Sequence, residues 1–274
     1  MPHEQVFTGA GHPYYPPFAV IPNYAPNITP LPVLFASFCL VLGIVLTTAA
    51  LLAGRARPSF RDASLSDRAL FLWFVLCGSL HCGFEGYFVL HHATLAGAQS
   101  LPAQLWKEYA LSDSRYLTSD PFTLCVETLT VVAWGPLCWA AAVAIVRDAS
   151  CHRGGSGGDG GGSAGDGRNV GAKSGLRVAL QMLASFAHLY GVALYYGTAG
   201  ADLLLRGTAH CRPEFVYVWV YFVGMNAPWV VVPAVVLYSS VQHIRRVFAA
   251  LDRVDATLHA SSSLQATMEP KKRR

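Results

Sequence analysis

The stretch Pro32 to Ala53, PVLFASFCLVLGIVLTTAALLA, contains no charged residue. A helix needs about 20 mostly apolar residues to cross the roughly 30 Å hydrocarbon core of a bilayer. Four later stretches are of similar length and are largely apolar, although each also holds polar or ionisable side chains. The sequence therefore predicts an all-α, polytopic membrane protein, a bundle of five transmembrane helices at about residues 32–53, 69–92, 122–146, 178–205 and 215–240.

The composition of the whole chain agrees with this fold class. Of the 274 residues, 53% are hydrophobic and 13% are charged, whereas soluble domains average about 25% charged residues. The mean hydropathy of +0.37 excludes a disordered chain, because so much apolar surface cannot stay in water. The net charge of +4 is small, and the basic residues lie between apolar stretches, so no nucleic-acid partner is expected.

The basic residues are distributed unevenly about the five predicted spans. All but four of the 20 Lys and Arg residues fall on one side, which the positive-inside rule assigns to the cytosol. The four exceptions are Lys107, Arg115, Arg206 and Arg212. We therefore expect a lumenal N-terminal segment, residues 1–31, and a basic cytosolic tail, residues 241–274. The first 31 residues lack the pattern of a cleavable signal, so we expect the first span to be retained.

Three further features bear on location and processing. The chain ends in Lys271-Lys272-Arg273-Arg274, the form of a dilysine retrieval signal, which favours the endoplasmic reticulum; a basic tail near anionic lipid is the alternative. The stretch 151–175, which contains GGSGGDGGGSAGDG, predicts a disordered cytosolic loop within the membrane domain, residues 32–240. The sequon at Asn27 lies just before Pro30 and close to the first span, so we expect it to be poorly used.

The seven cysteines are an odd number, and most of them lie inside predicted spans. Their spacing matches neither a disulfide framework nor a zinc motif, so we expect no metal. A cysteine in an apolar helix packs as a small apolar side chain. The cysteines within the spans are Cys39, Cys77, Cys82, Cys125 and Cys138.

Several ionisable side chains fall inside the predicted spans. Each costs roughly 2.5 to 3.5 kcal/mol on insertion scales, so it indicates a functional site by default. His81 and Glu85, four residues apart, share one face of the second span, and Glu127 lies in the third. Asn226 and Trp229 lie one turn apart in the fifth. At about 1.5 Å of rise per residue, these groups reach overlapping depths in the lumenal half of the membrane, which predicts one shared pocket.

Such a pocket suits a reaction that passes through a cation in an apolar substrate. An acid can protonate an alkene while a base removes a neighbouring proton, and an aromatic face attracts the cation in between. This chemistry requires no cofactor. Packing hydrogen bonds between helices are the alternative role for such side chains, and they are the expected role for Thr130 and His188.

Four motifs resemble a known family. They are CGSLHCGFEGYFVL (Cys77 to Leu90), LWKEYALSDSRYLTSDPFT (Leu105 to Thr123), VETLTVVAWGPL (Val126 to Leu137) and MNAPW (Met225 to Trp229). Together with HPYYPPF near the N-terminus, they are similar to the emopamil-binding family of 3β-hydroxysteroid Δ8,Δ7-isomerases, which share the EXPERA domain. The likeness covers nearly the whole chain outside the Gly-rich stretch.

The resemblance implies a homodimeric protein of the endoplasmic reticulum membrane, and also of the nuclear envelope, with cholestenol Δ-isomerase activity. Such an enzyme protonates carbon 9 of a Δ8-sterol and removes a proton from carbon 7. The family also binds cationic amphiphilic amines and joins a sterol reductase in an anti-oestrogen binding assembly. By position, the acid and base residues match His81, Glu85 and Glu127, and the residues around substrate or cation match Asn226, Trp229, Thr130, Tyr109, Tyr116, Asp113 and Arg115.

Two departures and two alternatives accompany the resemblance. Val192 stands where close relatives carry an acid, and Pro228 removes a helical hydrogen bond, which predicts a kink in the fifth span. A non-catalytic paralogue that binds sterols or amphiphilic amines is the alternative function. A transporter is disfavoured, because no broken spans recur in matching halves. The spacing leaves open whether His81 or Glu85 donates the proton.

Overall fold

The computed structural model of the protein describes residues 11–149 and 166–268, of which 166–174 and 263–268 are described by their backbone alone. Every regular element within these ranges is helical. Five helical segments are long and apolar enough to cross a membrane, which confirms the predicted fold class. They cover Leu31–Ala56, Leu65–His91, Pro121–Asp148, Gly175–Arg206 and Val216–Ser262.

Short π-helical and 3-10 segments interrupt these spans or connect them. The π-helical segments are η2, η5 and η7, and the 3-10 segments are η1, η3 and η4. In chain order the elements are α1 (Leu31–Ala56), η1 (Pro58–Asp62), α2 (Leu65–Ser79), η2 (Leu80–Glu85), α3 (Gly86–His91), η3 (Leu95–Gly97), α4 (Leu101–Tyr109), η4 (Ser114–Tyr116), α5 (Pro121–Leu129), η5 (Thr130–Trp134), α6 (Gly135–Asp148), α7 (Asp166–Arg206), η7 (Val216–Gly224) and α8 (Ala227–Met268).

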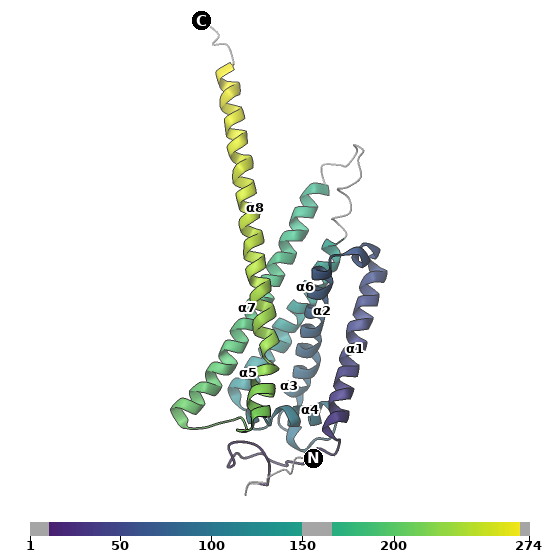
Figure 1. Ribbon diagram of the computed structural model, residues 1–274, viewed down its shortest axis with the longest axis vertical. Helices are drawn as coiled ribbons and strands as arrows, with labels where there is room; N and C mark the ends of the chain where they lie inside the picture. Colours follow the sequence, from purple (N-terminus) through teal and green to yellow (C-terminus); the bar gives the residue numbers. More distant parts are fainter. Residues whose placement is uncertain (1–10, 150–165, 269–274) are drawn as a thin grey trace.

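Helix α1 lies at the edge of the bundle (Figure 1). It begins directly after Pro30, whose extended backbone is typical of the residue before a helix, and a second proline occupies its first turn. Only Leu34, Ala53 and Gly54 of this helix are buried. Val45, Leu46 and Ala49 pack, partly buried, against the central core. Exposed apolar side chains such as Leu40 and Ile44 are left for lipid, as expected of a charge-free span.

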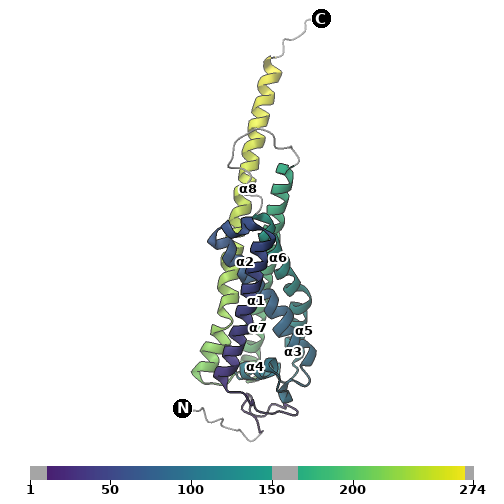
Figure 2. The same ribbon diagram turned by 90° about the vertical axis from the view of Figure 1, so that its right-hand side faces the viewer.

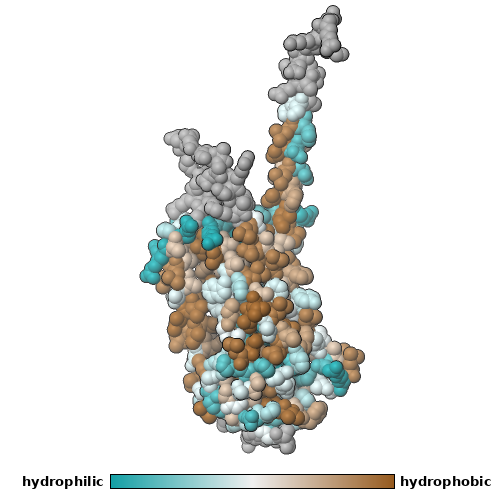
Figure 3. All heavy atoms as spheres, turned by 180° about the vertical axis from the view of Figure 1, so that it is seen from behind, coloured by the Kyte–Doolittle hydropathy of each residue, from teal (hydrophilic) through white to brown (hydrophobic). Residues whose placement is uncertain are grey.

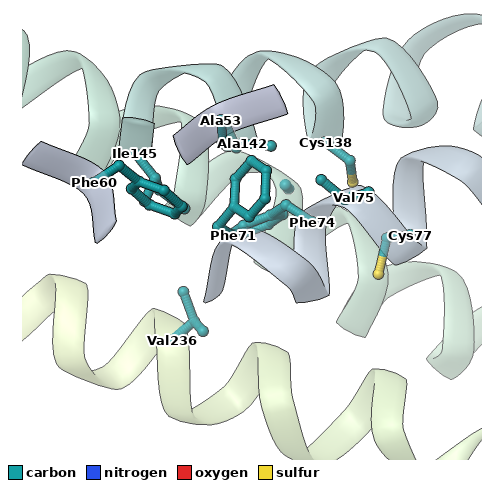
Figure 4. Packing of buried hydrophobic residues seen from close by; sticks show 12 residues of the cluster. Ala53, Phe60, Phe71, Phe74, Val75, Cys77, Cys138, Ala142, Ile145 and Val236 are labelled. Atoms are coloured by element: carbon teal, nitrogen blue, oxygen red, sulfur yellow. The ribbon is translucent and has the colours of Figure 1, made fainter. Parts of the chain in front are cut away.

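The centre of the bundle is formed by α2, α6, α7 and α8, which pack against one another. Phe71 and Phe74 of α2 meet Ile145 of α6 and Val236 of α8 in one buried cluster (Figure 4). Cys77 and Cys138 lie at the end of this cluster away from Phe60. The cluster thus brings two thiols to the middle of the bundle.

An ion-pair triad joins three of these helices. Arg177 of α7 donates a hydrogen bond of 3.2 Å to the carboxylate of Asp148 at the end of α6, and it also pairs with Asp67 in the first turn of α2. All three side chains are largely buried. The triad therefore joins the ends of α2 and α6 that lie opposite α4 to the first half of α7.

At the α4 end, α4 and the N-terminal segment close the bundle (Figure 2). The Tyr14 hydroxyl donates to the carbonyl oxygen of Lys107 at 3.1 Å, and the Lys107 ammonium donates to the carbonyl of Ala25 at 2.8 Å. Burial lowers the pKa of Lys107. The Gln104 side chain accepts hydrogen bonds from the backbone of Ile28 and Thr29. Residues 12–29 are thereby held against α4.

The face of the bundle seen in Figure 3 carries large apolar areas in its middle and more polar side chains toward both ends. This distribution fits a polytopic membrane protein. Helix α8 continues well beyond the other helices, and its projecting part has an apolar side and a polar side (Figures 1 and 3).

The last two spans differ from their predicted bounds. Helix α7 begins at Asp166, inside the stretch 151–175 expected to be disordered, and α8 extends to Met268 through most of the predicted tail. Ala, Leu and Arg residues after Ser240 favour the continuation of α8, whereas Gly167 and Gly171 disfavour a helix, so composition does not account for the early start of α7. Hydropathy marks only the parts that fit within a membrane. Residues 1–10, 150–165 and 269–274 lie outside the described residues, so the N-terminal end, most of the Gly-rich stretch and the basic signal Lys271 to Arg274 do as well.

Candidate active site

Two π-helical segments, η2 in the second span and η5 in the third, face each other at the centre of the site. A π turn inserted into an α-helix often marks a functional position. Gly135, directly after η5, permits the close approach, because a Cβ atom there would collide with the Cys82 thiol and lie 3.3 Å from the Cβ of His81. The backbone of the third span therefore lies against the residues that carry His81.

His81 and Glu85 form the pair predicted from their four-residue spacing. Nδ1 of His81 lies 2.8 Å from one carboxylate oxygen of Glu85 and 2.9 Å from the other. His81 is buried, and the Glu85 side chain is 17% exposed. A carboxylate only accepts hydrogen bonds, so Nδ1 of His81 carries the proton in this contact. Nε2 is then the ring nitrogen that can either hold or lack a proton.

Nε2 of His81 contacts His188, a residue that was expected only to form a hydrogen bond between helices. It lies 3.0 Å from Nε2 of His188, in α7. His188 also contacts the Cys138 thiol at 3.7 Å, and its Nδ1 has no hydrogen-bond partner among the described residues. The expected interhelical contact is confirmed, and it places His188 in direct contact with the predicted acid–base pair.

Glu127 is held by a tyrosine from outside the span. The Tyr116 hydroxyl, in η4, donates a hydrogen bond of 2.6 Å to Oε1 of Glu127. Burial raises the pKa of Tyr116 well above its usual value, so the phenol stays a donor. Glu85 and His81 both interact electrostatically with Glu127. The structure thus brings together the three residues expected to act as acid and base.

Asn226 and Trp229 enter the site from the fifth span. The Asn226 amide donates to the Tyr109 hydroxyl at 3.1 Å and to the Phe222 carbonyl at 2.7 Å. The Trp229 ring lies 5.5 Å from that of Trp73, which in turn meets His188 edge-on at 6.4 Å. Tyr109 and Tyr116 contact each other at 5.6 Å between ring centroids. Trp73 thus connects one aromatic pair to His188, and Tyr116 connects the other pair to Glu127; these four rings are termed the aromatic wall.

The helix is interrupted just before the proline that predicted a kink. The π segment η7 ends at Gly224, a turn covers Met225 and Asn226, and α8 starts at Ala227. Pro228 then occupies the second position of a new helix, where its missing N–H costs no internal hydrogen bond. The break leaves the Asn226 amide directed toward Tyr109.

Asp113 and Arg115 are buried beside the site rather than in it. Arg115 pairs with Asp113 at 2.6 Å, donates to the Thr198 hydroxyl at 2.8 Å, and lies over the Tyr195 ring. Burial disfavours its charge, but hydrogen bonds and charge from Asp113 outweigh that cost and raise the pKa of Arg115. The pair therefore locks the loop after α4 onto α7.

Thr130 is not brought to the other polar groups by a hydrogen bond. Its hydroxyl donates to the Val126 carbonyl at 2.9 Å, one turn earlier in its own helix. This agrees with the packing role that its residue type favours.

Three neighbours of the predicted site could not be assigned to it from the sequence: His188, Cys138 and Trp73. His188 is 107 residues from its partner His81 in the chain, so no local spacing connects them. A histidine within an apolar span was the available signal. The contact of Cys138 with His188 arises only when α6 packs against α7.

The fold defines the class of the protein, a polytopic membrane protein. Its buried site holds a donor–acceptor pair, a second carboxyl and aromatic rings, which are groups that general acid–base chemistry uses. The profile of the EXPERA family (EXPanded EBP superfamily) matches residues 101–240. The chain is similar to the 3-beta-hydroxysteroid-Delta(8),Delta(7)-isomerases of Mus musculus, 31% identical over 88% of this chain and 92% of the mouse protein, and of Cavia porcellus, 33% identical over 89% and 94%. It is also 30% identical to an isomeliandiol synthase of Melia azedarach, over 70% of this chain and 76% of that protein. The chain belongs to the EXPERA family, and the resemblance of its motifs to that family is confirmed.

Proposed function

We propose that the protein is a sterol isomerase that shifts a Δ8 double bond to Δ7 in the synthesis of cholesterol-type sterols. The observation that carries the proposal is the meeting of His81 and Glu85, in η2, with Glu127, three residues before the facing segment η5. The similarity to named Δ8,Δ7-isomerases over most of both chains supports the substrate class.

In this mechanism the His81–Glu85 pair delivers a proton to carbon 9 of the sterol, and Glu127 removes the proton from carbon 7. The electrons of the Δ8 bond form the new C9–H bond and leave a cation at carbon 8. The C7–H electrons then form the Δ7 bond, so atoms and charge balance without a cofactor. One Glu127 oxygen is held by Tyr116, which leaves the other to accept the proton.

The aromatic wall stabilises the cation between the two steps. A cation over an aromatic face gains about 0.5 to 2 kcal/mol, and more when water is excluded. Trp229 lies in the fifth span and contacts Trp73, and Tyr109 accepts a hydrogen bond from Asn226 of the same span. An ammonium group on an apolar body would mimic this cation, so the same pocket would also bind cationic amphiphilic amines.

The proposal includes the endoplasmic reticulum membrane, with the N-terminus in the lumen and the C-terminus in the cytosol.

It also includes a homodimer, supported by the exposed apolar stripe of α8. Its residues recur every three or four positions, as in a coiled-coil seam; they are Val247, Leu251, Val254 and Leu258. The resemblance also implies an assembly with a sterol reductase, which would lie in the same membrane as this protein.

A second candidate is a non-catalytic binding protein for sterols or amphiphilic amines. One observation favours it. Both ring nitrogens of His81 already have partners, Glu85 and His188, as in a purely structural hydrogen-bonded chain. Binding of an amphiphilic amine without conversion of sterol would support this candidate.

The test is expression of the full chain in isomerase-deficient cells that are fed a Δ8-sterol, with the Δ7 product measured by mass spectrometry. We expect product from the wild type and a loss of at least a hundredfold with Glu127→Gln, which keeps the shape of the side chain but not its basicity. Equal conversion by both would remove Glu127 from the mechanism. No conversion by well-expressed wild type that still binds an amine would favour the binding protein.

A further inference from the structure

Four soft metal ligands meet inside the bundle, on the side of His81 away from Glu85. Cys77 and His81 lie one turn apart at the junction of α2 and η2, Cys138 comes from α6, and His188 comes from α7. All four side chains are at least 96% buried. Three helices far apart in the sequence therefore supply the two imidazoles and two thiols that tetrahedral zinc sites use.

The ligand atoms lie close enough together for one ion to bind all four after small shifts of the side chains. In tetrahedral zinc sites, bonds of about 2.0 to 2.3 Å place ligand atoms roughly 3.3 to 3.8 Å apart. Here the two Nε2 atoms are 3.0 Å apart, and the Cys138 sulfur is 3.7 Å from Nε2 of His188. The ligand atoms of Cys77, His81 and His188 lie within 4.8 Å of one another. The Cys138 thiol also contacts Cys77 and His81.

The outer partner of one ligand is already in place. A metal-binding histidine commonly donates its other ring N–H to a carboxylate, which fixes the tautomer and directs the free nitrogen at the ion. Glu85 makes this contact with Nδ1 of His81 at 2.8 Å, so the Nε2 lone pair of neutral His81 points into the cluster.

A line of buried polar groups leads to the cluster along α7. Gln181 Nε2, Ser185 Oγ and His188 Nδ1 follow one another at helical spacing, and none has a hydrogen-bond partner among the described residues. Apolar packing does not require such groups, and leaving them unpaired costs free energy. They give an ion or water a polar path from the Arg177 end of the bundle.

We propose that Cys77, His81, Cys138 and His188 bind one Zn²⁺ ion in a closed, four-coordinate site between α2, α6 and α7. Each thiol releases its proton to solvent when the ion binds, so the two thiolates balance the charge of Zn²⁺. The site adds a metal ligand role to a residue of the proposed acid–base pair.

Zn²⁺ on Nε2 of His81 would occupy the ring nitrogen that does not contact Glu85, so this nitrogen could no longer carry a proton for the reaction. The metal-loaded protein would therefore be inactive, and zinc would act as an inhibitor. This regulatory part rests on the proposed isomerase function, whereas binding of the ion does not depend on it.

The test uses the purified full-length protein in detergent, reduced and metal-free, titrated with Co²⁺ as a spectroscopic substitute for Zn²⁺. We expect the visible bands of tetrahedral Co²⁺ and a near-ultraviolet thiolate-to-cobalt band, which saturate at one ion per chain and disappear when Zn²⁺ is added. Cys138→Ser keeps the volume of the side chain, and it should lose about half of the thiolate band and weaken binding at least tenfold.

Cys82→Ser is the matched control. Cys82 is adjacent to His81 but exposed and outside the cluster, so its variant should bind Co²⁺ as the wild type does. No thiolate band in the wild type, or an unchanged band in Cys138→Ser, would overturn the site. Zn²⁺ should lower sterol conversion at least tenfold in the wild type and less in Cys138→Ser. Binding with undiminished conversion would overturn inhibition alone, and binding without any conversion would count only against the isomerase.

Discussion

The Tyr116 hydroxyl donates a hydrogen bond of 2.6 Å to the carboxylate of Glu127. Tyr116 belongs to η4, in the loop between α4 and α5, whereas Glu127 lies in the third span. The bond therefore couples the layer that closes the bundle to the proposed base inside it. The site cannot form correctly unless this layer is folded.

Tyr116→Phe removes this bond and keeps the buried ring. A hydrogen bond to a charged group contributes about 1.5 to 3 kcal/mol, so we expect sterol conversion to fall roughly ten- to hundredfold. Conversion assays on matched amounts of protein would measure the loss. Tyr15→Phe is a suitable control, because the Tyr15 side chain makes no described contact with Glu127. Wild-type conversion by Tyr116→Phe would exclude Tyr116 as a positioning residue.

Gly135 is predicted to resist substitution. Its added Cβ would collide with the Cys82 thiol and press on His81, and overpacking of this kind costs about 1 to 3 kcal/mol. We expect Gly135→Ala to lower the thermal midpoint in detergent and to reduce conversion more than stability alone explains. Gly83→Ala, whose Cβ would meet nothing within 4 Å, is the matched control. Equal behaviour of the two variants would contradict close contact between η2 and the third span.

The Asp113–Arg115 pair should matter for folding more than a surface pair does. Arg115→Met leaves the buried Asp113 carboxylate unpaired, and breaking a buried pair costs about 3 to 5 kcal/mol. Arg206→Met breaks a pair with Asp202 in which the arginine is 76% exposed, which should cost under about 1 kcal/mol. Thermal unfolding of both purified variants would compare them. A similar midpoint for the two would show that the buried pair contributes little.

The sequon at Asn27 should remain unglycosylated even if the segment faces the lumen. The Asn27 amide donates to the Gln104 carbonyl at 2.9 Å, and its Oδ1 is buried, so an oligosaccharide transferase cannot reach it after folding.

A sequon in an added N-terminal tag should be glycosylated, whereas one in a C-terminal tag should not. Glycosidase-sensitive gel mobility distinguishes these cases. A glycan on the C-terminal tag would reverse the proposed orientation.

The sequence alone predicted the spans and part of the site, for definite physical reasons. A charge-free stretch such as Pro32 to Ala53 has one stable environment, and two residues four apart in a helix must be neighbours, so the contact of His81 with Glu85 followed from spacing. Pro228 predicted a kink in the fifth span, and the structure instead has a break at the preceding turn, with Pro228 in the first turn of α8.

The remainder depended on tertiary packing. Which side of α7 faces His81 is set by the rotation of a whole helix, so the contact with His188 could not be read from spacing. The π segments η2 and η5 also shift the register of the residues that follow, and Thr130, one α-turn after Glu127, bonds to its own helix instead. The contact of Cys138 with His188 required α6 and α7 to be placed together.

The central claim is proton addition at carbon 9 and removal at carbon 7 by the residues around Glu127. Its most direct test is conversion of a Δ8-sterol by membranes containing the protein in deuterated water, followed by mass spectrometry and NMR of the Δ7 product. The account predicts one deuterium per product molecule, located at carbon 9, and no product with Glu127→Gln. Product without deuterium would mean that the hydrogen moves within the substrate, and it would contradict a proton delivered by the protein.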